Sequence, residues 1–181
     1  MTPHELFTDR SLFTMAHGIV AGGAALLFLF AALHALWSAK AGIGTETDAP
    51  ARARPLVQLT ALAAAALWMV TFSGLYIVFP AYREPPPAGA TDLTAFPRAL
   101  LMADAGTRWL HAFAMEIKEH VPIAAAMLAT AVAFVAFRYR ALVIDDLPLR
   151  RMSMTLLAIG FLLASAAGVL GILVNKVAPL W

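Results

Sequence analysis

The stretch Leu12–Trp37, LFTMAHGIVAGGAALLFLFAALHALW, decides the fold class, because its 26 residues include no charged side chain. A helix needs about 20 apolar residues to cross the hydrocarbon core of a bilayer. The run is also longer than the ~7–15 apolar residues of a secretory signal peptide. It therefore predicts a membrane-spanning helix near the N-terminus that is retained.

Three further apolar stretches predict an all-α integral membrane four-helix bundle that forms one transmembrane domain over residues 1–181. The expected spans are 12–37, 56–80, 119–138 and 152–174. Segment 81–103 is expected to be an outer loop without helix, since it contains Pro85–Pro87 and Pro97. Residues 103–119 are expected to form an interfacial helix before the third span. Pro122 leaves two possibilities open, a single long helix with a kink or a new helix that begins there.

The composition supports this class and excludes several kinds of site. Hydrophobic residues make up 61% of the chain and charged residues only 13%, whereas a soluble domain carries roughly 25% charged residues. The absence of cysteine excludes disulfides, thiolate metal sites, iron–sulfur clusters and covalently attached haem. The net charge of +2 is small and dispersed, and it gives no indication of a nucleic-acid partner.

The distribution of basic residues predicts the orientation. The two short loops after the first and third spans hold seven of the 13 Lys and Arg residues, and the longer segments on the other side hold six. Positively charged loops tend to stay in the cytoplasm. Both termini and the loop 81–103 are therefore expected on the periplasmic side of a bacterial inner membrane.

His17 and His120 are the candidate cofactor ligands. His17 lies five residues into the first span and His120 lies at the mouth of the third. Because these two helices run in the same direction, the two imidazoles are expected at one depth, as two axial ligands of haem b require. Glu116 lies four residues before His120 and could fix its tautomer from the second coordination shell. The alternative is that all three are ordinary polar residues at the membrane surface.

Two other histidines are expected to stay outside this site. His111 lies nine residues before His120, which places it on the opposite face of a straight helix. His34 lies seventeen residues after His17, or ~25 Å along the helix. His4 is expected to be solvated.

Four helices, no cysteine and histidines at one end of two co-oriented spans resemble small membrane b-type cytochromes and the quinone-facing anchor subunits of respiratory enzymes. The resemblance implies an electron-transfer or anchor subunit of a larger respiratory or photosynthetic complex, with haem b near the outer face. Its partners would be the lipid bilayer, other membrane subunits and a quinone. Such cytochromes commonly hold two histidine pairs at opposite depths, and this chain departs from them in having one.

Two other functions fit the same sequence. The first is a structural accessory subunit without a cofactor, whose Ala- and Gly-rich faces pack against partner chains. The second is a metal-handling membrane protein that uses imidazole, carboxylate and thioether ligands. Its ligands would be His111, His120, Glu116 and Met115. The sequence does not decide whether the protein is an enzyme.

Overall fold

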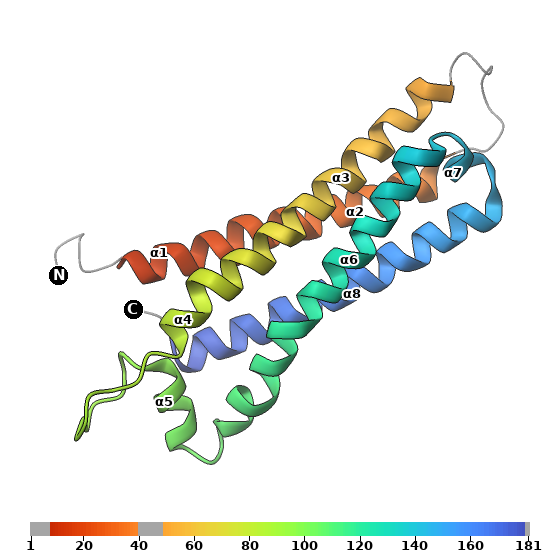
Figure 1. Ribbon diagram of the computed structural model, residues 1–181. Coiled ribbons are helices and arrows are strands. Elements are labelled where there is room, and N and C mark those ends of the chain that lie inside the picture. The colour runs from red at the N-terminus through yellow and green to blue at the C-terminus, as the bar shows by residue number, and fades with distance from the viewer. Residues whose placement is uncertain (1–7, 40–48, 180–181) are drawn as a thin grey trace.

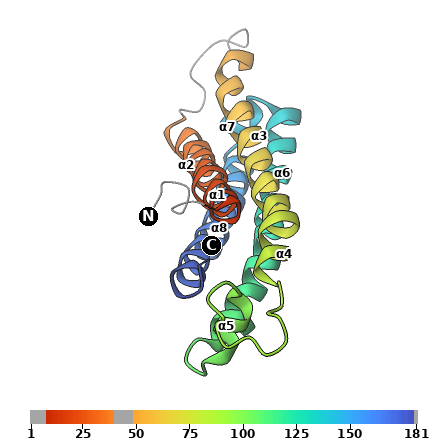
Figure 2. The ribbon, with the colours of Figure 1, turned by 90° about the vertical axis from the view of Figure 1, so that its left-hand side faces the viewer.

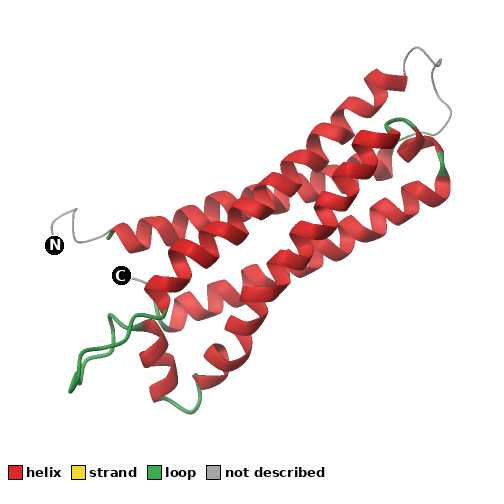
Figure 3. Cartoon of the chain, in the orientation of Figure 1, coloured by secondary structure: helices red, strands yellow, loops and turns green. Residues whose placement is uncertain are grey.

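The computed structural model of the chain describes residues 8–39 and 49–179, of which 49 and 50 are described by their backbone alone. His4 lies outside this part. Within it, every regular element is a helix, and the connections are loops and turns (Figure 3). Four helices are long and apolar enough to cross a membrane: Asp9–Ser38, Ala51–Tyr82, Leu110–Tyr139 and Leu147–Val177. The predicted all-α, four-helix membrane bundle is confirmed.

Each of the first three spanning helices includes a π-helical stretch. The first is made of α1 (Asp9–Met15), η2 (Ala16–Gly22) and α2 (Gly23–Ser38). The second is made of α3 (Ala49–Ser73), η4 (Gly74–Val78) and α4 (Phe79–Tyr82). The third is made of η5 (Leu110–Met115) and α6 (Glu116–Tyr139). The fourth is the uninterrupted α8 (Leu147–Val177).

The helices extend beyond the predicted spans, and two local predictions were wrong. The loop 81–103 contains a short helix, α5 (Pro97–Ala103). Pro97 is the first residue of α5, a position at which a backbone N–H group would have no hydrogen-bond partner within the helix. The N–H group that proline lacks is therefore not needed there. The interfacial helix expected over 103–119 is not a separate element, since residues 104–107 form a bend and a turn and the helical residues after them continue into the third span.

Proline inside a span does not end the helix here. Helix α6 runs through Pro122, so the third span is one continuous helix and not two. Likewise α3 begins at Ala49 and contains Pro55, in a segment that the sequence assigned to a loop. Membrane helices tolerate proline because neighbouring groups satisfy the carbonyl that it leaves free. The charged loop 138–151 also contains a helical turn, α7 (Leu142–Asp145).

The four spans pack in a ring in which each helix contacts two neighbours. The contacting pairs are α2 with α3, α3 with α6, α6 with α8 and α8 with α2 (Figure 1). The centre is lined by small side chains, among them Ala32, Ala63, Ala125 and Ala129, which are 0–1% exposed. Small residues let helix backbones approach closely inside a membrane. In contrast, large apolar side chains such as those of Ile19, Trp37 and Ile172 point outward and are 68–75% exposed, as contact with lipid requires.

The two ends of the bundle differ. One end carries α5 and the loop before it, together with the start of α1 and the end of α8, and the opposite end carries α7 (Figure 2). We call the first the α5 end. An ion pair between Arg10 and Glu84 ties the first span to the second there. At the α7 end, Arg52 binds Asp145 at 2.7 Å.

Candidate functional site

The three π-helical stretches of the described residues all lie in the half of the bundle nearest the α5 end. π-helical turns are rare, and they are frequent at functional sites. Each stretch contains or adjoins a polar side chain within an otherwise apolar helix. His17 lies in η2, Ser73 directly precedes η4, and His111 lies in η5. The candidate functional site therefore lies in this half of the bundle.

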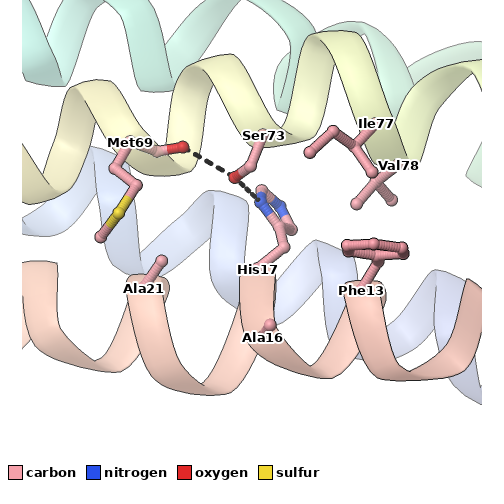
Figure 4. A pocket seen from close by; sticks show the side chains of 8 residues that line it. All are labelled: Phe13, Ala16, His17, Ala21, Met69, Ser73, Ile77 and Val78. Atoms are coloured by element: carbon pink, nitrogen blue, oxygen red, sulfur yellow. Dashed lines mark hydrogen bonds between the residues drawn. The ribbon is translucent and has the colours of Figure 1, made fainter. Parts of the chain in front are cut away.

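His17 makes a hydrogen bond that defines its tautomer. Its Nδ1 lies 2.9 Å from Oγ of Ser73, on the neighbouring helix (Figure 4). The single hydroxyl proton of Ser73 is donated to the carbonyl of Met69 at 2.7 Å. The Ser73 oxygen therefore accepts from Nδ1–H, and Nε2 of His17 carries a free lone pair. An imidazole held in this way can accept a hydrogen bond or bind a metal at Nε2.

A small cavity of about 170 Å³ lies beside His17 and Ser73. Its other walls are apolar, and Figure 4 shows them converging from the first two spans: Phe13, Ala16, Ala21, Met69, Ile77 and Val78. Gly74 gives the imidazole its room. A Cβ atom at this position would lie 3.0 Å from Cε1 of His17, which is closer than nearly all side-chain contacts.

Lys118 is the second polar group of this half, and it comes from the third span. The side chain is mostly withdrawn from solvent, and its ammonium lies against Gly171 of the fourth span. A Cβ atom on Gly171 would be only 2.5 Å from Nζ of Lys118. Among the described residues, no hydrogen bond or ion pair to this ammonium is present. Its charge acts electrostatically on His17.

All four spans thus contribute to one level of the bundle. His17 and Lys118 each lie eight residues from the start of their span, or ~12 Å along the axis. Ser73 and Gly171 lie nine and six residues from the α5 end of theirs, or ~14 and ~9 Å. We call His17, Ser73, Lys118 and the two glycines beside them, Gly74 and Gly171, the four-helix site. Ionisable groups at such depth are costly, and they mark functional positions more often than structural ones.

A second polar pair lies nearer the α5 end. The hydroxyl oxygen of Tyr82 is 2.9 Å from Nδ1 of His111. Tyr82 is 3% exposed and packs in an apolar cluster with Met115 and Val174. His111 is half-buried, so the pair connects the surface of the protein to its interior.

The structure does not bring the predicted ligands His17 and His120 together. The side chain of His120 is 72% exposed, and its Nδ1 contacts the backbone carbonyl of Glu116 at 2.9 Å. The Glu116 carboxylate lies 3.9 Å away and is also largely exposed. No hydrogen bond or ring contact within the described part of the chain joins the two histidines. Haem ligation by this pair stays a prediction.

The cavity beside His17 does not suit a haem in this arrangement. Drug-sized and cofactor sites usually occupy about 300–1,000 Å³, and this one has about 170 Å³. The space fits a single ring better than a porphyrin. The predicted metal ligands are also not gathered, since Met115 is buried, His111 binds Tyr82 and His120 faces outward. No group of three or more His, Asp or Glu side chains able to hold a metal occurs among the described residues.

His34 lies near the other end of its helix, where it is exposed and stacks on Phe30 with ring centroids 6.5 Å apart. Sequence reasoning did not name Ser73, Lys118 or Tyr82 as cofactor ligands. Lys118 was the one with a signal, because it belongs to the ionisable stretch 116–120 at the start of an apolar span. Comparison of the chain with protein-family models, with curated proteins and with solved structures found no match.

Proposed function

We propose that the chain is an electron-transfer or anchor subunit of a larger membrane complex, and that its four-helix site binds the headgroup of a quinol. The observation that carries the proposal is the hydrogen-bonded state of His17. Its Nδ1–H is used by Ser73, so the lone pair on Nε2 accepts from a hydroxyl group and not from a carbonyl. A quinol presents such a hydroxyl, whereas a quinone presents none.

The surroundings of His17 support a ligand of this chemistry. The cavity is apolar except for His17 and Ser73, and its volume of about 170 Å³ suits one substituted ring. An isoprenoid tail can leave such a cavity into the hydrocarbon, because the outward faces of both helices are apolar. Lys118 does not line the cavity, and it acts through its charge.

The proposed chemistry is a proton transfer. When the quinol is oxidised, Nε2 of His17 takes one hydroxyl proton as a general base and one electron leaves, and the second proton and electron leave in a second cycle of the same kind. The Lys118 ammonium favours the negative oxygen that forms, because a positive charge within a low-dielectric interior acts strongly on a nearby anion. The electrons pass to a redox subunit of the complex, which is the partner that this proposal requires.

Photolabelling with an azido-quinol, kept reduced in lipid nanodiscs, tests the proposal. We expect the label on peptides that contain residues 13–21 and 69–78, and we expect excess decylubiquinol to prevent it. His17→Ala should weaken decylubiquinol binding ~5–150-fold, as loss of a hydrogen bond of about 1–3 kcal/mol implies. His34→Ala is the matched control, since His34 is an exposed histidine on the same span.

A label spread over all four helices in proportion to their exposed area would contradict the proposal. So would binding of decylubiquinol that is equal in the wild-type protein and in His17→Ala.

A further inference from the structure

The Tyr82–His111 pair lies between the four-helix site and the surface at the α5 end. Tyr82 packs against Met115 of η5 and Val174 of α8. Lys118 and Gly171 each lie three residues deeper along the same two helices, a rise of ~4.5 Å. Residues three apart share a helix face. The Tyr82 side chain therefore packs about one helical turn nearer the α5 end than Lys118 and Gly171.

His111 faces the other way, toward charged groups at the surface. Electrostatic interactions connect it with Arg98 of α5, with Arg83 at the end of α4 and with Glu116 of α6. Tyr82 is influenced by Arg98 and by Glu119 of α6. From α8, Lys176 lies near this end and is exposed.

The hydrogen bond between Tyr82 and His111 can transfer a proton, in addition to holding the two side chains together. A phenol and an imidazole joined at 2.9 Å can exchange the proton between them. Tyr82 is buried, so it cannot exchange with water directly, whereas His111 is half-buried and can. From the interior to the surface, the level shared by His17 and Lys118 comes first, buried Tyr82 second and half-buried His111 last.

We propose that Tyr82 and His111 form a proton exit that carries the proton taken from a quinol at the four-helix site to water at the α5 end. This proposal rests on the proposed function. The proton taken by His17 moves toward the α5 end and reaches the Tyr82 oxygen while the Tyr82 O–H proton moves to Nδ1 of His111, and His111 releases its Nε2 proton to water. One proton leaves, and no group changes its final charge.

The test follows proton release from the full-length protein in nanodiscs with bound decylubiquinol. Ferricyanide oxidises the quinol, a pH dye reports the protons, and stopped flow resolves both. In the wild-type protein we expect proton release to keep pace with quinol oxidation. In Tyr82→Phe and His111→Gln we expect release to lag about 100-fold, the scale of a lost proton-transfer group, with unchanged affinity for decylubiquinol.

Two controls separate proton transfer from structure. Tyr76→Phe removes a hydroxyl from an exposed tyrosine on the same span, and it should behave as wild type. His111→Gln can keep a hydrogen bond to Tyr82 but cannot pass a proton on, so the test stands even if Tyr82→Phe folds poorly. A solvent isotope effect on proton release in the wild type that shrinks in Tyr76→Phe would contradict the assignment to Tyr82.

The two proposals fail in different ways. If wild-type protein binds no decylubiquinol, the proposed function is overturned and the proton exit with it. If it binds decylubiquinol but Tyr82→Phe and His111→Gln release protons at the wild-type rate, only the proton exit is overturned.

Discussion

Replacement of Lys118 by Met should make the protein more stable while weakening its site. Lys118 carries a charge eight residues into the third span, with no hydrogen bond or ion pair from the described residues. Methionine has nearly the same length and flexibility, and its thioether fits beside Gly171 without a charge. The substitution therefore removes a desolvated cation and leaves the packing of the interior largely in place.

The size of the effect follows from the depth of the residue. A lysine at the centre of a membrane helix costs about 2.5–3.5 kcal/mol on insertion scales. Lys118 lies ~12 Å from the start of its span, between the interface and the centre, and its side chain keeps some exposure. About half of the full cost should apply. We expect Lys118→Met to raise the free energy of unfolding by ~1–2 kcal/mol.

Reversible unfolding by SDS in mixed micelles measures this change. Lys176→Met is the matched control, because Lys176 is exposed in the last turn of α8. A cation there interacts favourably with the helix dipole by about 0.3–1 kcal/mol, so its removal should lower stability slightly. The two lysines should thus give changes of opposite sign. If Lys118→Met destabilised the protein by more than ~1 kcal/mol, the ammonium would have a stabilising partner, and the description of Lys118 as unpaired would be refuted.

Three further predictions test other parts of the structure. Gly74→Ala should destabilise the protein by ~1–2 kcal/mol relative to Gly168→Ala in the same unfolding assay, because a Cβ at Gly74 meets the His17 ring at 3.0 Å whereas one at Gly168 meets nothing within 4 Å; equal stabilities would mean that the ring moves freely. If the purified protein shows a b-type band in a reduced-minus-oxidised spectrum, His120→Ala should leave that band unchanged, since the His120 side chain is exposed and does not contact His17. Loss of the band in both His17→Ala and His120→Ala would instead support ligation of a haem by these two histidines. A reporter fused after the C-terminus should be active in the periplasm, and activity in the cytoplasm alone would reverse the orientation inferred from the basic loops.

Hydropathy predicted the number and order of the spans because length and apolar character are local properties of the chain. Each helix satisfies its own backbone hydrogen bonds, so a long apolar run in lipid has one regular structure available to it. The same reasoning failed at Pro55 and Pro122, which lie inside helices. Proline marks a helix end only where the freed carbonyl has no other way to be satisfied, and that depends on tertiary neighbours.

The π-helical stretches could not be predicted from the residues alone. Gly22 and Gly74 bound two of them, but glycines also occur throughout α8, which contains no π turn. A π turn holds one extra residue, and its cost is met by packing around it. The structure places all three stretches in the half of the bundle nearest the α5 end, and only this shared location singles out the polar residues beside them.

The site shows what helical geometry can predict and what it cannot. His17 lies at the level of the four-helix site, and His111 is half-buried whereas His120 is exposed. The geometry relates these residues to one another, but it does not say which face looks inward. His111 contacts buried Tyr82, Lys118 lies against Gly171, and His120 faces outward. The face of the third span that looks inward depends on small residues of the neighbouring helices, because Gly171 leaves the space that the Lys118 ammonium occupies.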